Sequence, residues 1–177
     1  LHFISVEAHP LSEAIWQHLA RLQPNSQTAQ ALAASPPRLL SGWHRRVLHQ
    51  GRVQLSLFHG DVGAAMADLQ RQQRQPVDAW FLDGFTPTKN PAMWHADVLA
   101  SVASLSTTDT TVATFTASGQ VRRDLQNLGF AMEKIDQRPF KRTSLLGRFV
   151  APASRQPVTA PSRVNVLGAG IAGAWAA

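Results

Sequence analysis

Short apolar runs alternate with amphipathic segments along most of the chain. The runs predict six strands, near residues 3–7, 53–59, 77–83, 111–116, 131–135 and 144–150. Three segments with apolar residues at helical spacing lie between the first four strands and predict helices at 10–22, 61–73 and 90–105. Because strands that alternate with helices favour parallel pairing, the pattern predicts an α/β fold with a doubly wound sheet.

The last third of the predicted sheet has a different pattern. A helix is expected at 118–130, with Ser118 as its N-cap and Gly129 as its C-cap. The final two strands follow each other through the polar corner at 136–143. This arrangement favours an antiparallel pair at the far side of the sheet.

Two segments interrupt the alternation. Residues 33–52 carry two prolines, a Trp and several basic residues, and we interpret them as a linker or surface insertion. Residues 151–163 are rich in Ala, Pro and Ser, which is typical of an interdomain linker. We therefore expect a first domain at 1–150 and the start of a second at 164–177. The chain opens on a strand-like run and stops in a helix-like one, so we expect a piece of a longer protein.

Composition narrows the class of protein. The chain has 177 residues, of which 44% are hydrophobic and 16% charged, and this argues for a globular domain rather than disorder. The absence of Cys excludes disulfides, thiolate metal sites and a Cys nucleophile. The seven His lack the spacing of a metal-binding helix, so no metal is expected. No apolar run is long enough for a membrane span and no signal-peptide pattern is present, which favours the cytoplasm.

The charge balance is basic, with 17 Lys and Arg against 11 Asp and Glu, a formal net charge of +6. This favours a polyanionic partner, and nucleic acid in particular, although a merely basic surface is the alternative. The basic residues gather in two groups, which are Arg38, Arg45, Arg46 and Arg52, and then Arg122, Arg123, Arg138, Lys141, Arg142 and Arg148. Either group could contact phosphates, and either could be solvated charge.

Candidate chemistry lies where predicted strands end, because ligands of doubly wound sheets bind outside the carboxyl ends of the strands. Glu7 could accept both hydroxyls of a nucleotide ribose, or could be a helix N-terminal acid. Asp61 could accept from an adenine amino group, or could cap the following helix. Asp83 opens "DGFTPTKNPAMW", in which Gly84 would permit a ligand's close approach and Phe85 would offer a stacking face. A carboxylate held there could orient an amine and accept its proton, whereas the alternative is a simple Asp-Gly turn.

The segment "RVNVLGAGIAGA" places Gly168, Gly170 and Gly173 in GxGxxG spacing after a strand-like run. In that context the glycines predict a dinucleotide pyrophosphate site at a helix N-terminus.

Taken together, "FISVEAHPL", "FHGD", "WFLDGFTPTKNPAMW", "ATFTASGQVRRDLQNLGF" and "VNVLGAGIAGA" resemble the MnmC family of bifunctional tRNA-modifying enzymes. The resemblance implies a Rossmann-like S-adenosylmethionine-dependent methyltransferase domain fused to an FAD-dependent oxidoreductase domain. The FAD domain would remove a carboxymethyl group from a wobble uridine of tRNA. The methyltransferase would then convert 5-aminomethyl-2-thiouridine to 5-methylaminomethyl-2-thiouridine.

The resemblance also implies roles for individual residues. Glu7 would hold the cofactor ribose, Asp61 would lie near the adenine, and Asp83 would face the substrate amine. The remaining implied positions are Gly84 in the cofactor site, Phe85, Lys89, Asn90, Trp94, Arg122, Arg123, Lys141 and Arg142 toward the substrate, and Gly168, Gly170 and Gly173 in the FAD site.

One departure from the family concerns the first strand of the methyltransferase sheet and its glycine-rich turn, which do not precede Leu1. That strand is central in the usual topology, so its neighbours would expose unpaired backbone groups. We therefore expect these 177 residues alone to be inactive, unstable or both. The alternatives are a nicotinamide- or flavin-dependent oxidoreductase fragment that uses the GxGxxG, and a non-catalytic RNA-binding module.

Overall fold

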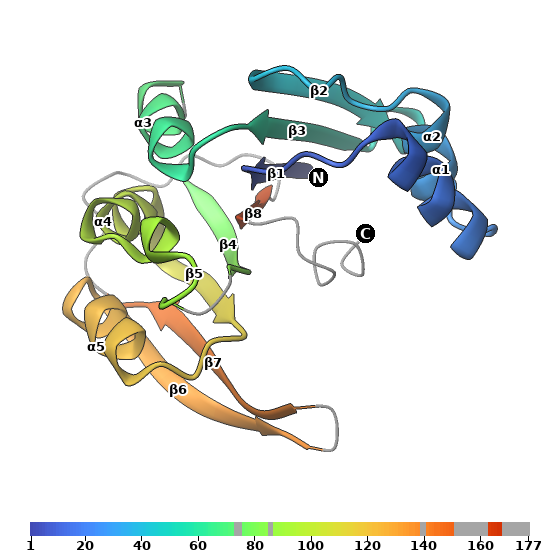
Figure 1. The fold of residues 1–177 in the computed structure, drawn as a ribbon. Coiled ribbons are helices and arrows are strands. Elements are labelled where there is room, and N and C mark those ends of the chain that lie inside the picture. Colours follow the sequence, from blue (N-terminus) through green and yellow to red (C-terminus); the bar gives the residue numbers. More distant parts are fainter. Residues whose placement is uncertain (73–75, 85–86, 139–140, 151–162, 168–177) are drawn as a thin grey trace.

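A single mixed sheet organises the residues that the computed structural model describes, which are 1–72, 76–84, 87–138, 141–150 and 163–167. Its strands are β1 (His2–Glu7), β2 (Gly42–Leu48), β3 (Val53–His59), β4 (Val77–Leu82), β5 (Ser106–Thr114), β6 (Phe130–Gln137), β7 (Lys141–Phe149) and β8 (Arg163–Leu167). They lie in the order β2-β3-β1-β8-β4-β5-β7-β6 (Figure 1). Strands β3, β1, β8, β4 and β5 are parallel, whereas β2 and the β6–β7 pair are antiparallel. The predicted doubly wound α/β sheet and its antiparallel far side are confirmed.

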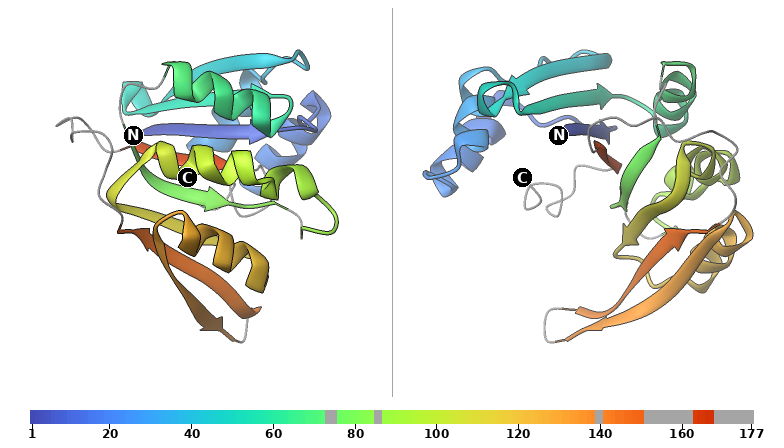
Figure 2. Two further views of the ribbon diagram at one scale, coloured as in Figure 1. Left: turned by 90° about the vertical axis from the view of Figure 1, so that its left-hand side faces the viewer. Right: turned by 180° about the vertical axis from the view of Figure 1, so that it is seen from behind.

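Helices cover the two faces unequally. They are α1 (Glu13–Leu22), α2 (Gln27–Ala34), α3 (Val62–Gln72), α4 (Ala96–Ser104) and α5 (Gly119–Asn127), with short 3-10 turns η1 (His49–Gly51) and η2 (Pro91–Trp94). Figure 2 shows α3, α4 and α5 side by side on one face, while α1 and α2 lie on the other face near β1 and β3. The caps of α5 agree with the prediction, since Ser118 accepts from the Val121 N–H and Gly129 has a φ of +100°.

The alternation of side chains along β1 divides the apolar residues into two clusters. Ile4 and Val6 point into the main core, which α3, α4 and α5 cover. Phe3 points to the other face and packs in a second cluster with residues of α1, α2 and β3. Such period-two alternation buries a different set of side chains on each face, so β1 is fixed between two packed layers.

Strand β8 occupies the centre of the sheet, between β1 and β4. It pairs in parallel with β1 from His2↔Arg163 to Ile4↔Asn165, and with β4 from Ala79↔Val164 to Leu82↔Leu167. The expectation that the neighbours of the central position would lack a pairing partner is therefore wrong, because residues 163–167 fill that position. The division into domains at residue 164 stays a prediction, and within the described residues 163–167 belong to the one sheet.

The interpretation of residues 33–52 as a linker or surface insertion is wrong in part. The segment contains β2 and η1, and β2 pairs with β3 over its full length, from Gly42↔His59 to Leu48↔Val53. An edge strand has a neighbour on one side only, and just the last of the seven residues of β2 is fully buried. Apolar alternation is therefore weak in "GWHRRVL", and the sequence pattern did not reveal the strand.

Candidate functional site

The three predicted acids all lie at one edge of the sheet, where β1, β3, β4 and β5 end; we call this the carboxyl edge. Glu7 is the last residue of β1, Asp61 follows β3 by two positions, and Asp83 follows β4 directly. The Gly60 N–H donates to the Glu7 backbone oxygen at 3.0 Å, which ties the ends of β1 and β3 together. The fold thus brings together acids that are 76 positions apart, as the sequence predicted.

Glu7 is half-buried and partly fixed. Its Oε1 accepts a hydrogen bond from the His9 N–H at 2.8 Å. Helix α1 begins only at Glu13, so the alternative role for Glu7, a helix N-terminal acid, is wrong. Among the described residues no hydrogen bond engages the second oxygen, Oε2. The carboxylate is therefore oriented by one oxygen and can accept from a ligand hydroxyl with the other.

Asp61 is exposed and caps the next helix. Its Oδ1 accepts from the Ala64 N–H at 3.1 Å, and its backbone oxygen accepts from the Ala65 N–H. A Cβ added at Gly63 would lie 3.0 Å from Oδ1, so Gly63 keeps this cap uncrowded. The capping alternative for Asp61 is thus confirmed, and its placement near an adenine stays a prediction that would involve Oδ2.

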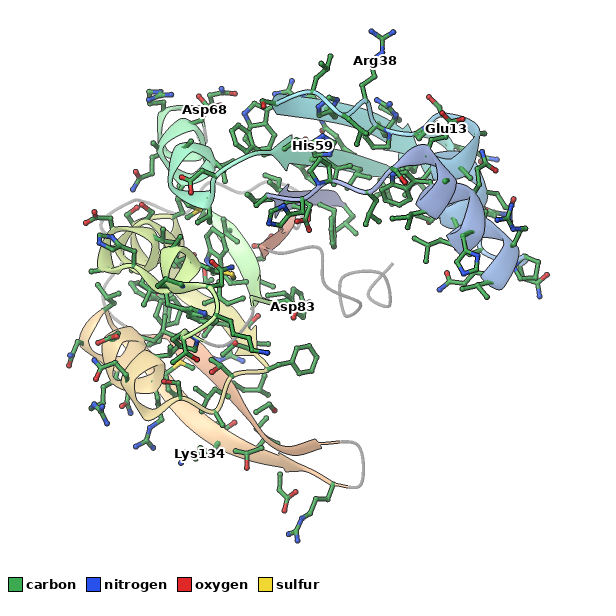
Figure 3. The ribbon with its side chains drawn as sticks, viewed as in Figure 1. Glu13, Arg38, His59, Asp68, Asp83 and Lys134 are labelled. Atoms are coloured by element: carbon green, nitrogen blue, oxygen red, sulfur yellow. The ribbon has the colours of Figure 1, made fainter. Side chains whose placement is uncertain are left out.

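Asp83 is half-buried and stands at the end of a well-anchored strand (Figure 3). Trp80 is 1% exposed, and its Nε1 donates to Ser106 Oγ at 3.0 Å, which fixes β4 against β5. The pairing Phe81↔Ala113 places residue 115 opposite residue 83 at the carboxyl edge. Phe115 is 44% exposed there, so an aromatic face is available at the same end of the sheet.

The loop after Asp83 is anchored by packing. A Cβ on Gly84 would lie 2.2 Å from Met93 Sδ, so the space beside Gly84 holds a protein side chain, and its predicted place in the cofactor site stays a prediction. Trp94 is 8% exposed in the main core, so it can shape the loop from beneath, and its contact with a substrate stays a prediction. Lys89 is exposed, Asn90 directly precedes η2, and Phe85 lies outside the described residues.

The predicted basic contacts also lie toward the carboxyl edge. Helix α5 starts there, and it carries Arg122, half-buried, and Arg123, which donates to Gln120 Oε1 at 2.8 Å. Strand β7 runs antiparallel to β5, so its first residues, Lys141 and Arg142, lie at the same edge, although their side chains are outside the described part. Gly168, Gly170 and Gly173 also lie outside the described residues.

The sequence reasoning missed a pair of histidines beside Glu7. His59 is 5% exposed, and its ring centroid lies 4.3 Å from that of His44. His59 Nδ1–H donates to the Arg38 carbonyl at 3.1 Å, and His44 Nε2–H donates to the Leu40 carbonyl at 2.7 Å. Burial, and then the neighbouring His44, lower the pKa of His59. A buried neutral histidine of this kind has no signature in one sequence.

A cavity of about 270 Å³ lies elsewhere, between the α1–α2 pair and the β1–β3 face. Its walls are mainly apolar and include Phe3, Trp16 and Leu32. None of the three carboxyl-edge acids lines it, so this cavity is separate from the candidate site. Among the described residues no cluster of His, Asp or Glu could hold a metal ion, and no helix has the length and apolarity to cross a membrane.

A doubly wound sheet with acids at its carboxyl edge is suited to binding a nucleotide-like cofactor. The family model for S-adenosyl-L-methionine-dependent methyltransferases matches residues 23–149, and the chain belongs to that family.

Curated relatives refine this assignment. A protein of Methylobacillus flagellatus named tRNA 5-methylaminomethyl-2-thiouridine biosynthesis bifunctional protein MnmC is 42% identical over 174 residues, covering 98% of this chain and 26% of that protein. The protein of the same name from Idiomarina loihiensis is 37% identical over 178 residues, covering 100% and 29%. The chain thus spans less than a third of these relatives' length. The crystal structure of MNMC2 from Aquifex aeolicus matches with a TM-score of 0.57 at 18% identity, over 88% of this chain and 55% of that one, and supports the same fold.

The Gly84–Met93 contact predicts the effect of adding one methyl group. Gly84→Ala should lower the free energy of unfolding by about 1–3 kcal/mol, because the new Cβ forces Met93 from its buried position. Chemical denaturation of both single variants and of Gly84→Ala with Met93→Ala would measure the coupling. We expect the second change to remove most of the cost of the first, and strictly additive losses would contradict the contact.

The lowered pKa of His59 predicts an acid-sensitive stability. The unfolded chain takes up this proton near pH 6.5, whereas the folded chain does so only at lower pH. The contribution of His59 to the free energy of unfolding is therefore fully present above pH 6.5, and it is lost as pH falls from there through the folded-state pKa. Urea unfolding between pH 7 and 5 should show this fall, and His59→Asn should flatten it. Asp68 and Asp136, whose pKa values are lowered from 3.8, lose their contribution only below that window. An unchanged slope in the variant would contradict the assignment.

Proposed function

We propose that this chain forms the substrate-facing part of a tRNA methyltransferase that N-methylates 5-aminomethyl-2-thiouridine to 5-methylaminomethyl-2-thiouridine. The observation that carries the proposal is the position of Glu7 and Asp83 at one carboxyl edge in a member of the S-adenosylmethionine-dependent methyltransferase family. The names of the relatives supply the nucleoside. Methylation of the amine of that nucleoside would use an acid that holds the substrate amine beside a methyl donor.

Glu7 and Asp61 supply the oxygen acceptors that the cofactor would need. When bound, S-adenosylmethionine supplies an electrophilic methyl group on a sulfonium. Glu7 would accept from a ribose hydroxyl through Oε2, because Oε1 is held by the His9 N–H. Asp61 would use Oδ2 toward the adenine amino group while Oδ1 keeps its cap on α3. Both assignments fit carboxylates whose orientation is already set before a ligand arrives.

Asp83 would act on the amine of the wobble uridine. Its carboxylate would orient the substrate ammonium, take one proton from it, and leave a nitrogen lone pair directed at the methyl carbon. The amine nitrogen would then form a bond to the methyl carbon that the cofactor supplies, and the electron pair of the broken carbon–sulfur bond would stay on the cofactor's sulfur. The exposed Phe115 stands at the same edge and offers a surface for the base. Much of the rate would come from this positioning.

The relatives' names describe bifunctional proteins, and we assign the second activity to an FAD-dependent oxidoreductase domain. Its GxGxxG glycines, Gly168, Gly170 and Gly173, lie outside the described residues, so that assignment rests on the sequence alone. An oxidoreductase fragment that uses these glycines as its main site does not account for the match at 23–149. With tRNA as its substrate, the protein would act in the cytoplasm.

Methyl transfer from labelled S-adenosylmethionine to tRNA with 5-aminomethyl-2-thiouridine tests the proposal. The chain would be assayed alone and fused behind the corresponding upstream segment of the Methylobacillus flagellatus relative. We expect the fused chain to incorporate label, and Asp83→Asn to slow incorporation by about 100-fold or more. The control is Asp97→Asn, which also removes one carboxylate, from a side chain that is 91% exposed on α4.

A folded, fused chain that transfers no label would contradict the methyltransferase assignment. Full activity in Asp83→Asn would be consistent with the methyltransferase assignment but would show that Asp83 has no catalytic role. It would favour an RNA-binding role for this edge. Label incorporated by the chain alone would show that the relative's upstream segment is not needed.

A further inference from the structure

The positive charge of the chain is concentrated at one end of the molecule. Residues 14–60 contain no Asp or Glu, but they contain five Arg and four His. The remainder of the chain has 12 basic residues against 11 acidic ones, so nearly all of the net charge of +6 resides in this one segment. It forms most of α1 together with α2, β2 and β3, which lie together at one end of the sheet (Figure 1). A segment with such an excess of positive charge attracts polyanions.

Outside residues 14–60, three arginines of the described chain have carboxylate partners, and Arg123 donates to Gln120 Oε1. Arg71 pairs with Asp68 at 2.9 Å, Arg148 pairs with Asp109 at 3.0 Å, and Arg138 pairs with Asp136. Among the described residues, no ion pair forms at Arg38 or Arg45, both of which are exposed. Their guanidinium groups are thus available to an external anion without the loss of an internal one.

Arg38 stands on a loop that is held by its carbonyl oxygens. Arg46 donates to the carbonyls of Ser35 at 3.1 Å and Pro36 at 3.0 Å. The buried His59 and its neighbour His44 hold the carbonyls of Arg38 and Leu40. Three side chains therefore fix residues 35–40, and Figure 3 shows Arg38 pointing away from the ribbon. A loop that is already ordered costs less entropy when it binds.

The loop and the catalytic acid share one edge of the sheet. Strand β2 begins beside the end of β3, at Gly42↔His59, so residues 35–40 enter the sheet at the carboxyl edge. Arg45 lies opposite Ser56, farther along the outer strand β2 and away from the carboxyl edge. An extended polyanion that follows this line would reach the edge where Asp83 lies.

We propose that Arg38 and Arg45, with the fixed loop 35–40, form the surface that binds the phosphate backbone of the RNA substrate. The inference rests on the proposed function for the identity of the RNA as tRNA. It assigns the phosphate contacts to the β2 end of the sheet, instead of to Arg122 and Arg123. Guanidinium groups bind phosphate oxygens in a bidentate manner, and backbone contacts of this kind position an RNA without reading its sequence.

Filter binding of a tRNA transcript to the 177-residue chain, without S-adenosylmethionine and over a range of salt concentrations, tests the proposal. Arg38→Glu with Arg45→Glu should weaken binding by roughly tenfold or more, and the alanine pair should reduce the salt slope by about 1.5–2, near one unit for each lost phosphate contact. The matched control is Lys134→Glu with Arg148→Glu, which makes the same charge change on β6 and β7. Circular dichroism would verify that all variants fold.

Selective loss in the Arg38 and Arg45 variants would support the assignment, even if the methyl-transfer assay fails. Equal losses in both pairs would show that only net charge matters, and would overturn it. Binding unaffected by either pair, or absent in the folded chain, would also overturn it. If the Arg38 and Arg45 variants retain both methyl transfer and RNA binding, this surface does not bind the RNA, and the proposed function still stands.

Discussion

Backbone pairing of β8 with β1 and β4 is the constraint on which the rest of the molecule depends. Without a strand in that position, β1 and β4 would each present a row of N–H and C=O groups with no sheet partner. Three residues of β1 and four of β4 pair with β8, and these contacts join the β2-β3-β1 side to the β4-β5-β7-β6 side. The alignment of Glu7 with Asp83 at one edge follows from this junction.

The same geometry determines which ligand each part of the sheet would contact. Strands β1 and β3 end in oxygens that are already partly engaged, at Glu7 by His9 and at Asp61 by Ala64, so these acids are oriented for ligand hydroxyl or amino groups. Strand β4 is anchored by Trp80 and ends in Asp83, which is suited to a substrate amine. At the outer strand, Arg45 forms no ion pair within the described residues. Successive parts of one sheet would thus bind the cofactor, the reacting amine and the phosphate backbone.

Much of the fold could be predicted from the sequence because strong periodicity and local capping signals determine it. Ser118 and Gly129 mark the ends of α5 through general rules of helix capping. The acids at the ends of β1, β3 and β4 were found because topology sends parallel strands to one edge. In contrast, β2 was missed because an edge strand buries few side chains, and the place of β8 was missed because strand order is non-local. The packing of Gly84 against Met93 and of Trp94 in the core could not be predicted, because it is a property of the folded chain alone.

Hydrogen exchange of the β1 and β4 amides tests the central claim most directly. The comparison is between the 177-residue chain and a version that ends at residue 150, which removes β8. The account predicts slow exchange in the whole chain for the amides of 2–4 and 79–82 that bond to β8, and fast exchange for the same amides in the shorter version. Equal protection of these amides in both chains would contradict the claim that β8 completes the sheet.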